Sequence, residues 1–293
     1  MYTIKTLNEI SPLGLNSLDK SLFSVSPDFE DPDAIIVRSA KITPDMLNPK
    51  LKCIARAGAG YNNICVEECT KRGIAVFNTP GANANAVKEL AVCSLILASR
   101  NVIAANSWLR ENSANPDVAA AAEKGKSQFA GNEIKGKTLG IIGYGAVGKL
   151  VGAAAEALGM NVLSYDKYAP CNSSEEEIFA RSDYIALHAL LTEETRGKVN
   201  SATIAQMKDG VRIINLARAE LVNDDDIIAA LASGKVACYV TDLPNNKTAN
   251  VPGIIAIPHL GASTAESEEN CALMACGSVA AFLTNGDTTH MVN

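Results

Sequence analysis

Residues Gly143-Tyr144-Gly145-Ala146-Val147-Gly148 have the spacing GxGxxG, which is typical of a loop that binds a dinucleotide. In such a loop the first glycine makes a tight turn, the second lets the backbone approach a pyrophosphate, and the third lets a helix pack closely on a strand. The preceding residues 138–142 are strand-like, and residues 146–158 form a helical pattern of small residues. This context predicts phosphate binding at the N-terminus of that helix.

Asp166 lies 18 residues beyond Gly148, directly after the next predicted strand, 161–165. A carboxylate there would accept hydrogen bonds from the adenosine ribose and repel a 2′-phosphate, which favours NAD over NADP. Lys167, next in the chain, weakens this preference slightly. The alternative interpretation is a glycine-rich turn followed by a solvated aspartate.

Two further side chains could act on an acid substrate. His259 follows the predicted strand 253–257, and Arg218 follows the predicted strand 211–214. Ligands bind at the carboxyl ends of strands in open parallel sheets. A histidine can take the hydroxyl proton of an alcohol near neutral pH, and an arginine can hold a carboxylate. For Arg218 alone, an ordinary surface salt bridge is an equally good interpretation.

The elements that must position these residues alternate between short apolar strands and helical patterns. The first series has strands at 34–37, 53–55 and 74–77 and ends in a long helix, 84–100. Residues 101–137 are polar and have no strand signal, and a second series of six strands then runs from 138 to 257. This rhythm predicts an α/β fold with two lobes and mostly parallel sheets. The last predicted helix spans 265–284.

Composition excludes several classes of protein. The chain has 293 residues, of which 47% are hydrophobic, and a net charge of −6, which argues against a general nucleic-acid binder. The longest apolar stretch, 90–98, is too short to cross a bilayer, and no secretory signal opens the chain, so we expect no membrane partner. Eight scattered cysteines without a CxxC pair indicate a reduced, cytoplasmic protein, and three unclustered histidines predict no metal site.

Several motifs in order resemble the D-isomer-specific 2-hydroxyacid dehydrogenases over nearly the whole chain. The motifs are Val37-Arg38-Ser39-Ala40, Arg56 to Ile64, Phe77 to Gly81, Asn83, Glu89-Leu90, Gly136 to Gly143, Asn215 to Arg218, Asp242 and Pro258 to Thr264. The resemblance implies two Rossmann-like domains with the active site in the cleft between them. Residues 1–98 and 266–293 would form a discontinuous substrate domain, and residues 99–265 an NAD-binding domain. It further implies a homodimer, formed through the segment 101–137.

The same resemblance implies a role for each matching residue. Arg218 would bind the substrate carboxylate and carbonyl, and His259 would be the acid/base that takes the C2 hydroxyl proton. The substrate would also be held by Arg38, Ser39, Gly60 and Asn83. Besides the glycine loop, the NAD site would comprise Ala59, Ala146, Val147, Asp166, Ala189, Leu190, Leu216, Asp242 and Gly261, with Asp242 near the nicotinamide amide.

One departure concerns the histidine's usual partner. The family has a glutamate in the stretch that here reads Asp242-Leu243-Pro244-Asn245-Asn246-Lys247, and Lys247 stands in its place. A base without an anionic neighbour gives up its proton more readily. We therefore predict that the rate of oxidation begins to rise at lower pH than in relatives with the glutamate. Lys247 itself could bind a substrate phosphate or be a solvated loop residue.

Within the family, the motifs are most similar to the branch that oxidises 3-phospho-D-glycerate to 3-phosphohydroxypyruvate, the first step of L-serine biosynthesis. A reductase of glyoxylate or hydroxypyruvate, or a D-lactate dehydrogenase, is the alternative. A remote one is an NAD-sensing corepressor that binds peptides. The chain ends at Asn293, just after the last predicted helix, so it is either a short form without a C-terminal regulatory domain or a truncated one.

Overall fold

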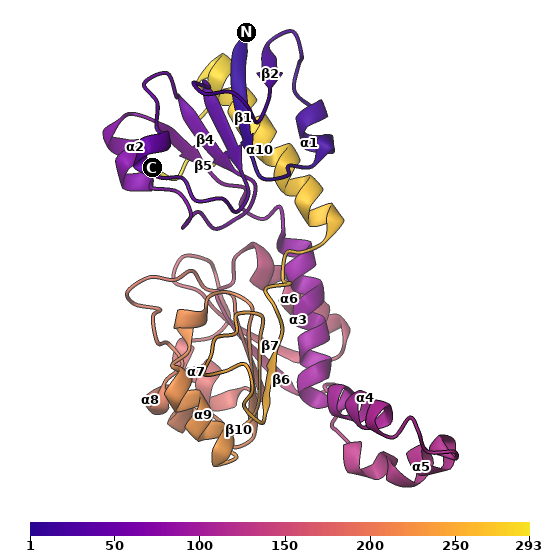
Figure 1. Cartoon of the computed structure of the whole chain (residues 1–293). Helices are drawn as coiled ribbons and strands as arrows, with labels where there is room; N and C mark the ends of the chain where they lie inside the picture. The colour runs from indigo at the N-terminus through magenta and orange to yellow at the C-terminus, as the bar shows by residue number, and fades with distance from the viewer. The chain divides into compact units, whose positions relative to one another are not determined.

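The computed structural model describes residues 1–293 and consists of two compact units. Unit 1 comprises Met1–Ala86 and Ala262–Asn293, and unit 2 comprises Val87–Gly261. Each unit contains one sheet in which every strand pairing is parallel (Figure 1). The prediction of an α/β fold with parallel sheets is confirmed. The division falls 12 residues earlier along the long helix than the expected boundary at residue 98, and the function of each domain stays a prediction.

The sheet of unit 1 has the strand order β2-β1-β3-β4-β5. Its central strand β3 (Ala34–Val37) is buried at all four positions, because helices or loops cover both faces of a parallel sheet. The other elements of this unit are β1 (Tyr2–Leu7), α1 (Pro12–Asn16), β2 (Phe23–Val25), η1 (Pro44–Met46), β4 (Cys53–Arg56), α2 (Val66–Lys71), β5 (Ala75–Phe77) and α10 (Ala265–Asn285). The helix α3 (Ala84–Ser99) begins in unit 1 and continues into unit 2.

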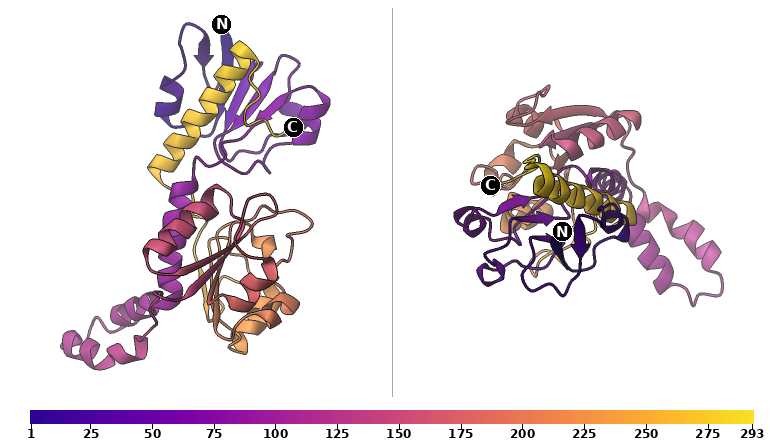
Figure 2. Two further views of the ribbon diagram at one scale, coloured as in Figure 1. Left: turned by 180° about the vertical axis from the view of Figure 1, so that it is seen from behind. Right: turned by 90° about the horizontal axis from the view of Figure 1, so that it is seen from above.

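The C-terminal helix α10 completes the core of unit 1. Cys271, Ala275 and Val279 of this helix are buried in one cluster with Ile36 and Phe77 of the sheet. Figure 2 shows α10, in yellow, running along the strands of this unit. The two ends of the chain therefore fold together, which makes unit 1 discontinuous in sequence.

The sheet of unit 2 has the order β11-β10-β9-β8-β6-β7. The chain starts at β6, adds β7 on one side and then continues with β8 on the other, which defines a switch point next to β6. Ligands bind at such points in open α/β sheets. The bounds are β6 (Thr138–Ile142), α6 (Ala146–Ala157), β7 (Asn161–Tyr165), α7 (Glu175–Arg181), β8 (Tyr184–Leu187), α8 (Ser201–Gln206), β9 (Val211–Asn215), η3 (Ala219–Leu221), α9 (Asp224–Ala232), β10 (Val236–Thr241) and β11 (Ile254–Ala256).

Helices cover both faces of this second sheet. A Cβ atom on Gly140 would lie 2.6 Å from Ile178 of α7, whereas the next residue, Ile141, contacts the α6 side. On β8, the Tyr184 hydroxyl hydrogen bonds the Ser99 hydroxyl of α3 at 2.8 Å. Apolar residues of α7, α8 and α9 form one cluster with the sheet. The strands are therefore fixed between two layers, and only their ends are available for a site.

Two helices of unit 2, α4 (Val102–Glu111) and α5 (Val118–Gly125), contribute no buried residue. They extend from the rest of this unit (Figures 1 and 2). Residues 126–129 form a 3₁₀ turn, η2, and Trp108 packs on Phe129. No single helix of the chain is long and apolar enough to cross a bilayer, and α3 with α4 satisfies that requirement only as a pair bent by 69°.

Candidate active site

The glycine loop connects β6 to α6 and has the geometry that the sequence predicts. Gly143 has a φ of 97°, and a Cβ atom there would lie 2.3 Å from the backbone nitrogen of Ala189. A Cβ on Gly148 would lie 2.2 Å from the carbonyl oxygen of Gly143. These positions need glycine, one because of its left-handed backbone and both because of close backbone approach.

Gly145 differs from the other two glycines, because a Cβ atom on it would meet no atom within 4 Å. It is the N-cap of α6, and no side chain caps this helix. The N–H groups of the first turn therefore have no side-chain cap at the positive end of the helix dipole. Exposed Ala146 and half-buried Val147 begin the helix. This is an arrangement that binds a phosphate group.

Asp166 lies directly after β7, beside the glycine loop. One carboxylate oxygen accepts a hydrogen bond from the N–H of Tyr144 at 2.8 Å, and the other accepts from Tyr168 and Ala169 at 2.8 and 3.1 Å. These three bonds fix the carboxylate at the switch point. The oxygen bonded to Tyr144 keeps a lone pair that could accept a hydrogen bond from a ribose hydroxyl.

Ala189 and Leu190 follow β8 on the other side of β6. Ala189 is half-buried, and Leu190 is 79% exposed although it is apolar. Between β8 and Ala189 lies His188, whose Nε2 is buried without a hydrogen-bond partner. Burial lowers the pKa of His188 to about 4, so this ring is neutral at physiological pH. The backbone of His188 lies against Gly143 of the glycine loop.

Arg218, Asp242 and His259 follow three neighbouring strands, β9, β10 and β11, respectively. Because these strands are parallel, the three residues lie at one edge of the sheet. Leu216, which is 8% exposed, belongs to the same segment as Arg218. Unit 2 thus assembles the predicted acid/base, a cation and a carboxylate from segments 24 and 17 residues apart.

Asn215, the last residue of β9, shapes the turn that carries Arg218. It is fully buried, its Nδ2 donates to the carbonyl of Arg218 at 2.8 Å, and its Oδ1 accepts from the N–H of Ala217 at 3.1 Å. The guanidinium of Arg218 donates to the carbonyl of Ala217 at 2.6 Å. Sequence reasoning named Asn215 only as part of a motif; a polar residue ending an apolar strand was the available signal.

Asp242 is a buried carboxylate, with 1% of its surface exposed. Its Oδ2 accepts a hydrogen bond from the N–H of Gly261 at 2.8 Å, and its Oδ1 is buried without a partner. Burial raises the pKa of the Asp242 carboxyl, which the Gly261 bond and the charges of His259 and Arg218 partly offset. A buried acceptor without a donor is costly, so a ligand that donates a hydrogen bond would be favoured here.

His259 has an unusual backbone for a residue with a side chain. Its φ is 22°, and its N–H donates to the carbonyl of Asp242 at 2.7 Å. Sparsely populated backbone conformations of this kind cluster at functional sites. The side chain is exposed. The strained turn therefore holds an accessible imidazole next to the buried carboxylate.

Lys247, in the place of the family glutamate, forms an ion pair with Asp225 in the first turn of α9. Its Nζ lies 2.8 and 2.9 Å from the two carboxylate oxygens. Both side chains are more than half exposed. Of the two interpretations for Lys247, a solvated loop residue agrees better with this contact.

The remaining predicted residues lie in unit 1. Arg38 follows β3, and its guanidinium forms an ion pair with Glu268 of α10. Arg56 ends the neighbouring strand β4; its Nε donates to the carbonyl of Arg38 at 3.0 Å, and its guanidinium lies over Gly58. Sequence reasoning quoted Arg56 in a motif but gave it no role. The other predicted residues here are exposed Ser39 and half-buried Ala59, Gly60 and Asn83.

Comparison with known proteins agrees with this geometry. Residues 92–261 match the NAD binding domain of the D-isomer specific 2-hydroxyacid dehydrogenases. The chain is 38% identical over 254 residues to a hydroxypyruvate reductase of Thermotoga maritima, covering 80% of each chain. It is 35% identical over 268 residues to D-3-phosphoglycerate dehydrogenase of Bacillus subtilis, covering 85% of this chain but only 49% of the relative.

Among solved structures, an NAD⁺-bound 3-phosphoglycerate dehydrogenase of Entamoeba histolytica has a TM-score of 0.82 and 30% identity. The match covers 100% of this chain and 98% of that one. The chain belongs to the D-isomer specific 2-hydroxyacid dehydrogenase family. NAD is its cofactor, as predicted, and the open cradle at Gly145, the fixed Asp166 and the unpartnered Asp242 oxygen fit that group.

Proposed function

We propose that this protein oxidises 3-phospho-D-glycerate to 3-phosphohydroxypyruvate with NAD, the first step of L-serine biosynthesis. The observation that carries the reaction type is the meeting of Arg218, Asp242 and His259 at one edge of a dinucleotide-binding sheet. When bound, NAD supplies the acceptor for a hydride.

In this proposal His259 is the general acid/base. Its exposed imidazole takes the proton of the C2 hydroxyl group during oxidation and returns it during reduction. Asp242, held by the backbone of Gly261, stabilises the imidazolium that forms, and its unpartnered Oδ1 would accept a hydrogen bond from the nicotinamide amide of bound NAD. The pH dependence predicted from the absence of the glutamate stays a prediction.

Arg218 binds the substrate carboxylate in the same scheme. A guanidinium can hold a carboxylate by two parallel hydrogen bonds, which fixes the orientation of the C2 carbon. The turn built by buried Asn215 fixes the backbone that carries this side chain. The cofactor roles of Ala59, Leu216 and Gly261 and the substrate roles of Ser39, Gly60 and Asn83 are part of the proposal.

The choice of a phosphorylated substrate is supported by Arg38 and Arg56. Arg56 ends β4 in register with Val37, the last residue of β3, and Arg38 is the next residue after Val37. Both arginines therefore lie at the carboxyl end of the sheet. Two guanidinium groups suit a phosphate dianion. The ion pair of Arg38 with Glu268 reduces this positive charge, and a substrate phosphate would have to compete with it.

Reduction of hydroxypyruvate is the second candidate. It is favoured by the 38% identity to the Thermotoga maritima reductase, of which the match covers 80%, and by the neutralisation of Arg38. Hydroxypyruvate has no phosphate and needs no second cation. Assays with a panel of D-2-hydroxy acids and 2-keto acids, monitored by NADH absorbance, distinguish the two. Turnover of hydroxypyruvate alone would discard the phosphoglycerate assignment.

We propose further that the protein is a cytoplasmic homodimer without a nucleic-acid or membrane partner. All eight cysteines are free, which suits a reducing compartment. On α4, apolar side chains are exposed where the family resemblance expects a second copy. These are Val102, Ile103 and Leu109, with exposed fractions from 41% to 51%.

A further inference from the structure

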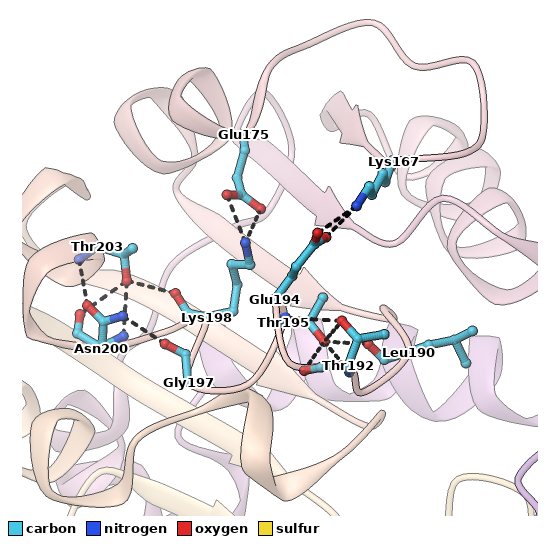
Figure 3. A network of polar contacts seen from close by, with 10 residues as sticks. All are labelled: Lys167, Glu175, Leu190, Thr192, Glu194, Thr195, Gly197, Lys198, Asn200 and Thr203. Atoms are coloured by element: carbon cyan, nitrogen blue, oxygen red, sulfur yellow. Dashed lines mark hydrogen bonds and ion pairs between the residues drawn. The ribbon is translucent and has the colours of Figure 1, made fainter.

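Lys167 lies next to Asp166, at the position where a 2′-phosphate on the adenosine ribose would need a cation. A free lysine there would favour NADP and oppose the effect of the aspartate. In the structure, however, Lys167 Nζ lies 2.7 and 2.6 Å from the two carboxylate oxygens of Glu194 (Figure 3). The cation is therefore already paired at both oxygens of one carboxylate.

Glu194 is carried on a turn that is itself ordered by hydrogen bonds. The Thr195 hydroxyl donates to the carbonyl of Leu190 at 2.6 Å and accepts from the N–H of Thr192 at 2.8 Å. The turn ends at Lys198, which forms an ion pair with Glu175 of α7 at 3.0 Å (Figure 3). Glu194 is therefore placed by the loop that also carries the predicted cofactor residue Leu190.

The charges around the predicted ribose site decide what can bind there. Glu194 neutralises the charge of Lys167, so the negative charge of Asp166 is left without a compensating cation. The pair with Glu194 raises the pKa of Lys167, which agrees with a cation that is already engaged. A 2′-phosphate could use the Lys167 cation only after displacing Glu194 from it. The ribose of NAD, which is uncharged, does not need that cation.

We propose that Glu194 is a second determinant of cofactor choice, which excludes NADP by holding Lys167 in a two-point ion pair. Glu194 would act through Lys167 and is thus a positioning residue, whereas Asp166 acts on the ribose directly. This proposal concerns the cofactor alone and does not depend on which hydroxy acid is the substrate.

The test is equilibrium binding of NADH and NADPH to the full-length protein, measured by nucleotide fluorescence. For Glu194→Gln we expect the Kd for NADPH to fall about five-fold, while the Kd for NADH stays within two-fold, because only NADPH carries the extra phosphate. The gain should shrink at high salt, since the charges are exposed and screened. Glu193→Gln is the matched control, because Glu193 is the adjacent exposed glutamate and should leave both constants unchanged.

A second variant separates positioning from simple repulsion. In a Lys167→Ala background, Glu194→Gln should change the Kd for NADPH less than two-fold, because there is no cation left to release. An unchanged NADPH affinity in Glu194→Gln would overturn the proposal. A full five-fold gain that persists without Lys167 would also overturn it, because Glu194 would then act by direct repulsion. Both side chains are more than half exposed, so the variants should fold.

Discussion

At the scale of single residues, burial of Asp242 favours its neutral carboxyl group, whereas its predicted role needs the ionised carboxylate. Burial raises the pKa of its carboxyl, which means that the folded state disfavours the ionised form. Stability from this group is fully present below the unfolded value of about 3.9 and is lost as the pH rises through the higher folded value. The carboxylate is thus kept at a cost in stability.

Replacing Asp242 by Asn should therefore stabilise the protein without cofactor. At pH 8 we expect a gain on the order of 1 kcal/mol, because a neutral amide can still accept the Gly261 hydrogen bond. This gain in the free energy of unfolding should disappear near pH 4, where the Asp242 carboxyl of the folded parent is neutral. Urea unfolding at the two pH values measures it, and NADH affinity should weaken in parallel. A variant less stable than the parent at pH 8 would contradict this account of the site.

The contact between Arg38 and Glu268 gives a second prediction at this scale. Glu268→Gln should leave the guanidinium available to a substrate phosphate, so the KM for 3-phospho-D-glycerate should fall several-fold while kcat changes little. Glu266→Gln, in the same turn of α10 and exposed, is the control. A KM that is unchanged in Glu268→Gln would argue against a phosphate at Arg38.

At the scale of elements, two glycines of the β6–α6 connection should have different roles, one in the stability of the fold and the other in cofactor binding. Gly148→Ala places a Cβ atom 2.2 Å from the Gly143 carbonyl oxygen and should destabilise the fold by roughly 2 kcal/mol or more, because strand and helix must move apart. Gly145→Ala meets no protein atom, so stability should be preserved while NADH binding weakens at least ten-fold. Thermal unfolding and NADH titration of both variants test this. Equal loss of stability in the two would be the contrary result.

Local sequence patterns predicted most of the sheet of unit 2, and β6 and β7 have the predicted bounds. Both strands contain mainly apolar residues and are bounded by turn-forming residues such as glycine and asparagine. Neighbouring residues are therefore enough to predict them. In contrast, β1 and β2 were not predicted. Thr3, Lys5 and Thr6 make β1 look polar, and its pairing with β2 and β3, which follow later in the chain, makes it a strand.

The candidate site likewise has residues that local sequence predicts and contacts that only the folded structure shows. Strand ends and the glycine motif located Gly143, Asp166 and Arg218 from neighbouring residues alone. The ion pairs that we propose to affect substrate and cofactor binding join residues distant in sequence, such as Arg38 with Glu268 and Lys167 with Glu194. No spacing rule indicates such pairs, because tertiary packing brings them together.

At the scale of the whole molecule, the apolar surface of α4 should be the contact between two copies. Ile103 and Leu109 are 46% and 41% exposed, although both are large and apolar. Ile103→Asp with Leu109→Asp should halve the mass in solution to the 30.7 kDa of one chain. Light scattering after size-exclusion chromatography measures it. A parent protein that is already monomeric would contradict the homodimer proposal.

The most direct test of the central claim is the rate of NADH formation from 3-phospho-D-glycerate by the parent protein and by His259→Ala, together with NADH affinity. We predict turnover by the parent, a loss of at least 10³-fold in kcat for the variant, and an NADH Kd within about three-fold of the parent's, since His259 acts on the proton and not on cofactor binding. Full activity of His259→Ala would contradict the account. So would the absence of turnover on every D-2-hydroxy acid by a parent protein that binds NADH.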